Sequence, residues 1–213
     1  MTAPAIAHVT AAVTTPPPFV DGRLARSART RTAVIDALIA LYEEGDLSPT
    51  AVRVAARAGV ALRTVYGQFA DMESLYAEAG ERQLGRAVEL ADVIPADRPF
   101  PERVRRFAAS RGVVLEWLLP IMRAATMREP GSPQLTRARE RFVALGDAET
   151  RQAFAVELAV LSGVECTSLL HAVHLVAGGP AWVSLRVDRG LDPAAAAALL
   201  QTVVTSVLCD AFR

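Results

Sequence analysis

The feature that most constrains the fold is residues 48–69, where two short helical stretches meet at a glycine. Gly59 suits a tight turn between helices because glycine tolerates a positive φ angle. Ala55, four residues earlier, is small enough to let the helices approach, and Val65, six residues later, can fill the core beneath them. A third, amphipathic helix predicted over residues 29–44 supplies the rest of that core. This layout predicts a helix-turn-helix, whose second helix enters the DNA major groove.

The second helix, predicted over residues 62–69, carries polar side chains suited to DNA contact. Arg63 can pair with guanine edges or phosphate, and Gln68 can pair with adenine. Thr64 can bind a phosphate or touch a thymine methyl group, and Tyr66 can donate to a phosphate. The alternative is an ordinary exposed helix face. The residues that we expect to contact DNA are Arg29, Ser48, Thr50, Arg53, Leu62, Arg63, Thr64, Tyr66, Gly67 and Gln68.

Charge supports this interpretation locally rather than globally. All 23 basic residues are Arg, and the formal net charge is zero, which excludes a histone-like protein that binds phosphate by bulk charge. Residues 23–70, however, hold seven Arg against four acidic residues, a net charge of +3. Four of these Arg lie in residues 23–31, which we expect to form an arm for phosphates or a minor groove. A solvated charged segment is the alternative.

The rest of the chain also predicts helices, and convincing alternating strand patterns are absent. Hydrophobic residues make up 52% of the chain but aromatic residues only 6%, so the core must be mostly Ala, Val and Leu, and alanine favours helix. Ser48-Pro49 predicts a helix start and Asp71 another, and Pro120 should kink or break a long helix. The predicted helices are 29–44, 49–57, 62–69, 72–94, one after Pro101, 134–145, 147–177, one ending near Val187, and one from Pro193.

Several other classes of protein have little support in the sequence. There is no Gly-rich phosphate loop, nucleophile elbow or His-Glu-x-x-His pattern, so we expect no enzyme and no cofactor. Cys166, His171 and His174 cannot converge on one metal ion from a straight helix, so no metal site is expected. Residues 166–185 lack Asp, Glu and Arg, but Gly178-Gly179-Pro180 interrupts them, which predicts a buried helix instead of a membrane span. Without a secretory signal, we expect a cytoplasmic protein.

One motif links this chain to a known family. It comprises Gly45, Thr50-Ala51-Val52, Val54-Ala55, Ala58-Gly59-Val60, Thr64-Val65-Tyr66-Gly67-Gln68-Phe69 and Met72-Glu73-Ser74-Leu75. With this motif, residues 29–76 resemble the DNA-binding domain of the TetR family of bacterial transcriptional regulators. Two positions depart from the family pattern. Ala61 replaces a hydroxyl cap, which costs ~1 kcal/mol of capping, and Met72 replaces a lysine that contacts phosphate in the family.

The resemblance implies an all-α protein with a three-helix helix-turn-helix domain joined to a larger helical ligand-binding and dimerisation domain. The expected divisions are a disordered tail at 1–22, the DNA-binding domain at 23–76, and the effector-binding and dimerisation domain at 77–213. The implied function is a homodimeric repressor that binds a palindromic DNA operator and releases it on binding a small, apolar effector. Two alternatives remain. One is a small-molecule binding or helix-bundle interaction protein whose helix-turn-helix is vestigial or docks another protein, and the other is a helical enzyme.

Candidate residues in the second domain follow from the same resemblance. Pocket-lining side chains are expected among Phe107, Trp117, Met122, His171 and His174, although plain core packing would use the same residue types. The last two long helices would pair across a two-fold axis as a four-helix bundle. The apolar stripe of the final helix supplies the candidate interface residues Leu200, Val203, Val204, Val207 and Leu208, although a helix buried within one subunit would look the same.

Overall fold

The computed structural model describes residues 22–128 and 132–211, and this part of the chain is helical with no strand. The predicted all-α class is therefore confirmed. The elements in chain order are α1 (Gly22–Glu43), α2 (Ala51–Ala58), α3 (Leu62–Gln68), α4 (Met72–Leu90), α5 (Phe100–Thr126), α6 (Pro133–Ala153), α7 (Ala155–Leu158), α8 (Gly163–Ala177), α9 (Gly179–Val183), the π-helical turn η1 (Ser184–Asp188) and α10 (Pro193–Ala211). The disordered tail predicted at 1–22 lies outside the described residues, except for Gly22, which begins α1.

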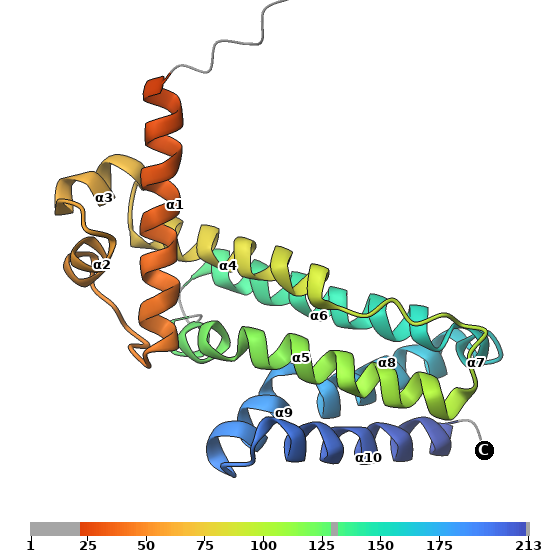
Figure 1. Ribbon diagram of the computed structural model, residues 1–213. Helices are drawn as coiled ribbons and strands as arrows, with labels where there is room; N and C mark the ends of the chain where they lie inside the picture. The colour runs from red at the N-terminus through yellow and green to blue at the C-terminus, as the bar shows by residue number, and fades with distance from the viewer. Residues whose placement is uncertain (1–21, 129–131, 212–213) are drawn as a thin grey trace, which may run out of the picture.

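The helices form two packed groups that share α4 (Figure 1). We call α1–α3, with the first two turns of α4, the N-terminal unit. It lies at one end of a bundle formed by the rest of α4 and by α5–α10. Because α4 follows α3 directly and then packs along α5 and α6, it connects the helix-turn-helix to the bundle.

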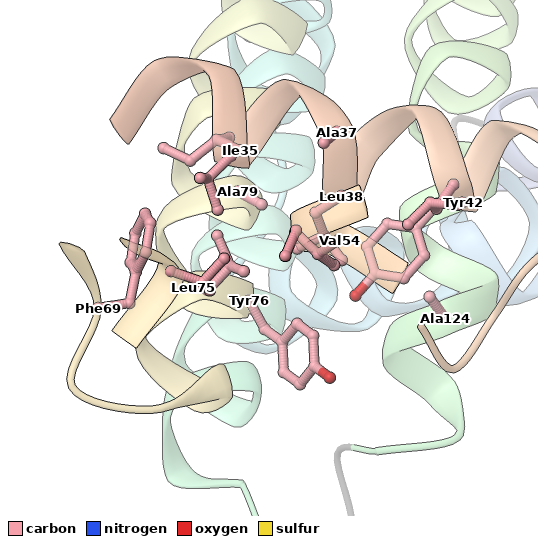
Figure 2. Close-up of a cluster of buried hydrophobic side chains, with 14 of the residues drawn as sticks. Ile35, Ala37, Leu38, Tyr42, Val54, Phe69, Leu75, Tyr76, Ala79 and Ala124 are labelled. Carbon is pink, nitrogen blue, oxygen red and sulfur yellow. The ribbon is translucent and has the colours of Figure 1, made fainter. Parts of the chain in front are cut away.

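The core of the N-terminal unit is small and apolar (Figure 2). Leu38, Val54 and Val65 come from three different helices and are at most 1% exposed. The prediction that Val65 fills the core is confirmed, and Ala55, which was expected to let the helices approach, is buried at 4% exposure. Two helices of the bundle add to this core, because Ala124 of α5 and Leu135 of α6 belong to the same buried cluster. The core of the N-terminal unit therefore includes side chains of the bundle.

Two starts of N-terminal helices differ from the prediction. Residues 23–31 were expected to form an arm, but they are the first turns of α1. Contacts distant in sequence hold them, since Ser27 hydrogen-bonds to Gln68 of α3 and Arg31 pairs with Glu78 of α4. The start of α2 lies two residues later than expected, because Thr50 caps it and accepts from the Arg53 amide at 3.3 Å.

Three predicted helix ends or breaks in the bundle also differ from the structure. α4 ends at Leu90, before the predicted stop at Pro95. α5 continues through Pro120, so the break considered at that residue is wrong. α6 continues through Gly146, where a break had been predicted. This glycine allows close approach, because a Cβ atom there would lie 3.4 Å from Nη2 of the Arg111 side chain.

The last long helices carry the most apolar sequence. The segments Gly163–Asp188 and Pro193–Ala211 are long and apolar enough to cross a membrane by length and composition alone. As predicted, the first is interrupted near Gly178, where α8 ends and α9 begins. α10 packs against α5 and α8, which places part of its apolar stripe inside the protein.

Candidate nucleic-acid interface and internal cavity

The turn between α2 and α3 has the geometry that the sequence predicted. Gly59 adopts φ +65°, and its amide donates to the carbonyl oxygens at the end of α2. The Val60 amide donates to the Ala55 carbonyl at 3.0 Å, which completes the helix end. Ala61 precedes α3 and offers no side-chain cap, so the first amides of α3 lack the hydroxyl acceptor found in the family pattern.

α3 buries one face and exposes the other. Val65 points into the core and is 1% exposed, whereas Tyr66 is 53% exposed. Arg63 and Gly67 are also exposed, and Leu62 is 40% exposed. A helix this short presents a convex row of side chains that can enter a major groove. The residues most free to make contacts are therefore at the start and in the middle of α3.

Four residues predicted to contact DNA already have protein partners. The Gln68 amide group exchanges hydrogen bonds with the Ser27 hydroxyl at 3.2 and 3.3 Å. Arg53 pairs with Asp46 at 2.9 Å, and the Thr50 hydroxyl caps α2. The Ser48 hydroxyl accepts from Arg128 Nη2 at 3.0 Å. Gln68 is therefore not a free adenine-reading group in this structure, because its amide group is bonded to α1.

The arginines of the N-terminal unit divide into paired and unpaired groups. Arg31 and Arg57 form ion pairs with Glu78 and Glu44. By contrast, the guanidinium groups of Arg26, Arg29 and Arg63 make no ion pair or hydrogen bond with any residue that the structure describes. All three are exposed. Unpaired cations on α1 and α3 are suited to phosphate contacts, which dominate the affinity of proteins for DNA.

The start of α4 completes this surface. Asp71 caps the helix, and its carboxylate accepts from the Ser74 amide at 2.7 Å and from the Ser74 hydroxyl at 2.6 Å. These hydrogen bonds hold the pKa of Asp71 below its usual value. Met72, which stands in the place of the family's lysine, is half-buried and packs against the core of the N-terminal unit. Met72 therefore contributes to packing and carries no charge.

A cavity of about 440 Å³ opens between α4, α5, α6, α8, α9 and η1. Its walls are mainly apolar, with polar side chains at Thr126, Arg139, His174, Ser184 and Asp188. The apolar and small lining residues are Gly80, Leu84, Leu118, Ile121, Met122, Ala125, Leu135, Ala138, Phe142, Val143, Gly179, Pro180 and Val183. This volume falls in the range of pockets that bind small organic molecules.

Two of the five residues expected to line a pocket do line this cavity, Met122 and His174. The other three do not. Phe107 is 2% exposed and packs its ring against Phe154 in the bundle core. Trp117 is 40% exposed on the outside of α5, and His171 is exposed on α8. The sequence could not show which of these residues line the cavity. Trp117 and Met122, for example, lie only a few residues apart on the same helix.

Burial shapes the chemistry of the cavity wall. Desolvation lowers the pKa of His174, and the nearby arginines Arg111 and Arg139 and His171 act in the same direction, while Asp147 opposes them. The lowered pKa favours the neutral imidazole of His174, which can both donate and accept a hydrogen bond. Among the residues that the structure describes, no group of three or more His, Cys, Asp or Glu side chains could hold a metal ion.

Three of the five residues expected at a dimer interface face inward instead. Leu200, Val204 and Leu208 are at most 2% exposed and belong to the bundle core, so the prediction that they form an interface is wrong. Val203 and Val207 are half-buried and lie toward the edge of the same stripe. The helical spacing was correct, but the stripe packs within the subunit.

Similarity to known proteins is found at the level of structure. No family model and no curated protein sequence matches the chain. A transcriptional regulator from Rhodococcus sp. RHA1 superposes with a TM-score of 0.66 at 16% identity, covering 86% of this chain and 96% of that one. A TetR-like transcriptional regulator from the same organism gives 0.55 at 17% identity, covering 84% and 96%.

A third match is NalD of Pseudomonas aeruginosa, the secondary repressor of the MexAB-OprM multidrug efflux pump. It gives a TM-score of 0.52 at 23% identity, covering 86% of this chain and 97% of that one. The chain has the TetR-regulator fold. The TetR fold accounts for nearly the whole described chain, so the similarity includes the bundle as well as the helix-turn-helix.

Proposed function

We propose that this chain is a ligand-responsive transcriptional regulator of the TetR type, a homodimeric repressor that binds a palindromic operator through α3. The observation that carries this proposal is the geometry of α3. Val65 anchors the helix in the core while Arg63 and Tyr66 project from its exposed face. The unpaired Arg26 and Arg29 add cations on α1. The TetR fold supports a DNA-binding regulator rather than an enzyme.

The cavity supports the ligand-responsive part of the proposal. Its lining is mostly aliphatic, and one Arg and one Asp balance in charge. We infer an effector with a largely apolar body and few polar groups, because an isolated charge would lose hydration without full compensation. Effector binding would shift a two-state equilibrium toward a form with lower affinity for DNA.

The homodimer is supported by side chains that the single chain leaves exposed. Val164 and Leu175 of α8 are 78% and 75% exposed, and Leu199 of α10 is 43% exposed. Since α8 and α10 pack side by side, two copies related by a two-fold axis could pair these helices as a four-helix bundle. Leu175→Asp combined with Leu199→Asp should therefore yield a monomer in sedimentation analysis. We also place the protein in the cytoplasm, where an operator is accessible.

The test is selection of DNA fragments from random and genomic pools by the purified protein at near-physiological salt. A variant carrying Arg63→Ala and Tyr66→Ala is selected in parallel as the matched control. Recovery of a palindrome by the wild type alone would support the proposal. If the wild type enriches nothing over the double variant, even at low salt, the regulator function is wrong, and protein docking by the helix-turn-helix becomes the function to test.

A further inference from the structure

The connection between α5 and α6 contacts the N-terminal unit through a side chain that the sequence did not single out. Arg128 follows α5, and its Nη2 atom donates to the Ser48 hydroxyl oxygen at 3.0 Å. Its guanidinium carbon lies 4.1 Å from the centroid of the Tyr76 ring on α4. The Tyr76 hydroxyl in turn donates to the Pro49 carbonyl at 3.3 Å. Arg128 and Tyr76 together hold residues 48–49, the entry to α2.

Arg128 leaves Ser48 ready for a phosphate. Because arginine has only donors, the Ser48 oxygen accepts from it and the hydroxyl hydrogen remains free to point elsewhere. A second contact lies at the start of α6, where the buried Ser132 caps the helix by accepting from the Leu135 amide at 3.1 Å. The Ser132 hydroxyl also donates to the carboxylate of Glu73 in the first turn of α4. Both contacts thus join the bundle to elements that flank α3.

The same stretch of α5 and α6 forms one wall of the cavity. Ile121 and Ala125 in the last turns of α5 line it, as do Leu135 and Ala138 in the first turns of α6. Leu135 is also a buried member of the core of the N-terminal unit, and Ile121 packs against that core. A molecule in the cavity would therefore press on side chains that the helix-turn-helix uses for its own packing.

We propose that Arg128 is the positioning residue that transmits occupancy of the cavity to the entry of α2. The inference deepens the proposed function by naming how its cavity is coupled to its DNA-binding surface. A shift of the end of α5, whose last turns line the cavity, moves Arg128 and releases or tightens Ser48 and Tyr76. Ser132 and Glu73 join the start of α6 to α4, so the motion reaches α2 and α4 together.

The test measures hydrogen exchange of the α2 and α3 amides in the full chain without DNA. Ala138→Phe places a ring in the cavity and stands in for a ligand. In the wild-type background, we expect this filling to change α2 exchange rates by at least about fivefold, the lower end of coupling between sites. With Arg128→Gln, the same filling should change them less than about twofold. Arg128→Lys, which keeps the charge but not the planar stack, should restore only part of the response.

Arg141→Gln is the matched control, because Arg141 pairs with Glu81 and also links α6 to α4, but away from α2. This variant should keep the full response to Ala138→Phe. Ala125→Leu provides a second filling variant if Ala138→Phe does not fold. The proposal is overturned if filling leaves α2 exchange unchanged in the wild-type background, or if the response survives Arg128→Gln. Since no DNA is present, either result is independent of whether an operator exists.

Discussion

The N-terminal unit and the bundle use their arginines in different ways. In the N-terminal unit, Arg53 and Arg57 pair with Asp46 and Glu44, and the two arginine side chains are 60% and 46% exposed. In the bundle, the side chains of Arg103 and Arg111 are only 4% and 3% exposed. Arg103 donates to the Ala153 carbonyl at the end of α6 at 2.7 Å, and Arg111 donates to the Ala177 carbonyl at the end of α8 at 3.0 Å.

This difference indicates that the arginines have different roles in the two regions. Buried arginines that satisfy the last carbonyls of helices, and that also pair with carboxylates, fix how the helices of the bundle meet. Exposed arginines in the N-terminal unit contribute little to stability and remain able to change partner. The two buried arginines therefore contribute to the folding of the bundle, whereas the N-terminal unit leaves Arg26, Arg29 and Arg63 unpaired at its surface among the residues that the structure describes.

The largest effect should come from removing a buried arginine. Arg111→Met leaves Glu149 without its partner at 2.9 Å and the Ala177 carbonyl without its donors. We expect the free energy of unfolding to fall by about 3 kcal/mol or more, because an unpaired buried charge remains. Arg57→Met in the N-terminal unit should cost less than about 1 kcal/mol. Urea unfolding of both variants measures the two decreases in unfolding free energy. Equal decreases would contradict the expected difference.

Two valines differ in how tightly they are packed, one in the N-terminal core and one in the cavity wall. Val54 is fully buried in the N-terminal core, while Val143 lines the cavity and is half-buried. Val54→Ala should reduce the free energy of unfolding by about 2 kcal/mol, from lost transfer free energy and a new void. Val143→Ala should cost less than about 1 kcal/mol, since it borders space that is already open. Unfolding curves with a larger loss for Val143→Ala would show that the cavity wall is tightly packed.

A smaller effect, and a gain, is expected at the helix that lacks a cap. Ala61→Ser would give the first turn of α3 a hydroxyl acceptor. The expected gain in unfolding free energy is about 0.5–1 kcal/mol. Asp71→Ala removes an existing cap on α4, should lower the free energy of unfolding, and serves as the opposite control. Thermal unfolding that ranks Ala61→Ser below the wild type would be inconsistent with an uncapped start of α3.

The last effect appears in the pH dependence of stability and concerns Glu157 in the bundle. Hydrogen bonding from Arg103 holds the pKa of Glu157 below its usual value of 4.5. Because the folded-state pKa is the lower one, the pair stabilises the fold above the ordinary carboxyl pKa, and this contribution is lost as the pH falls through the lowered pKa. Glu157→Gln should therefore flatten the acid side of a stability profile measured by urea unfolding. An unchanged acid side would contradict the pairing.

Much of the N-terminal unit could be predicted because its geometry is encoded locally. Gly59 with its positive φ angle, Asp71 as a cap and Val65 in the core follow from residue types at short spacing. The prediction that failed in the N-terminal unit concerns residues whose contacts are distant in sequence. Residues 23–31 become helical through contacts with Gln68 and Glu78, which a local pattern cannot show.

The bundle was harder to predict because the same residue types pack a core, line a cavity or form an interface. Gly146 looks like a helix stop, yet it makes room for Arg111 inside a continuous helix. The stripe containing Leu200 and Val204 has the spacing of an interface, and only packing shows that it faces inward. Arg128 was missed entirely, because neither of its partners, Ser48 and Tyr76, is close in sequence.

In the function that we propose, the exposed face of α3 contacts DNA. Fluorescence anisotropy on the selected palindrome tests it with three single variants at fixed salt. Arg63→Ala should weaken binding about 10- to 100-fold and relax specificity at one base pair. Arg29→Ala should weaken all sequences alike and reduce the salt slope by about one. Arg137→Ala, an exposed arginine on α6, is the matched control.

We expect Arg137→Ala to bind the palindrome like the wild type, whereas Arg63→Ala should bind it more weakly. If Arg63→Ala binds the palindrome as tightly as Arg137→Ala and with the same sequence preference, α3 does not read DNA, and the proposed DNA-binding function of this helix is wrong.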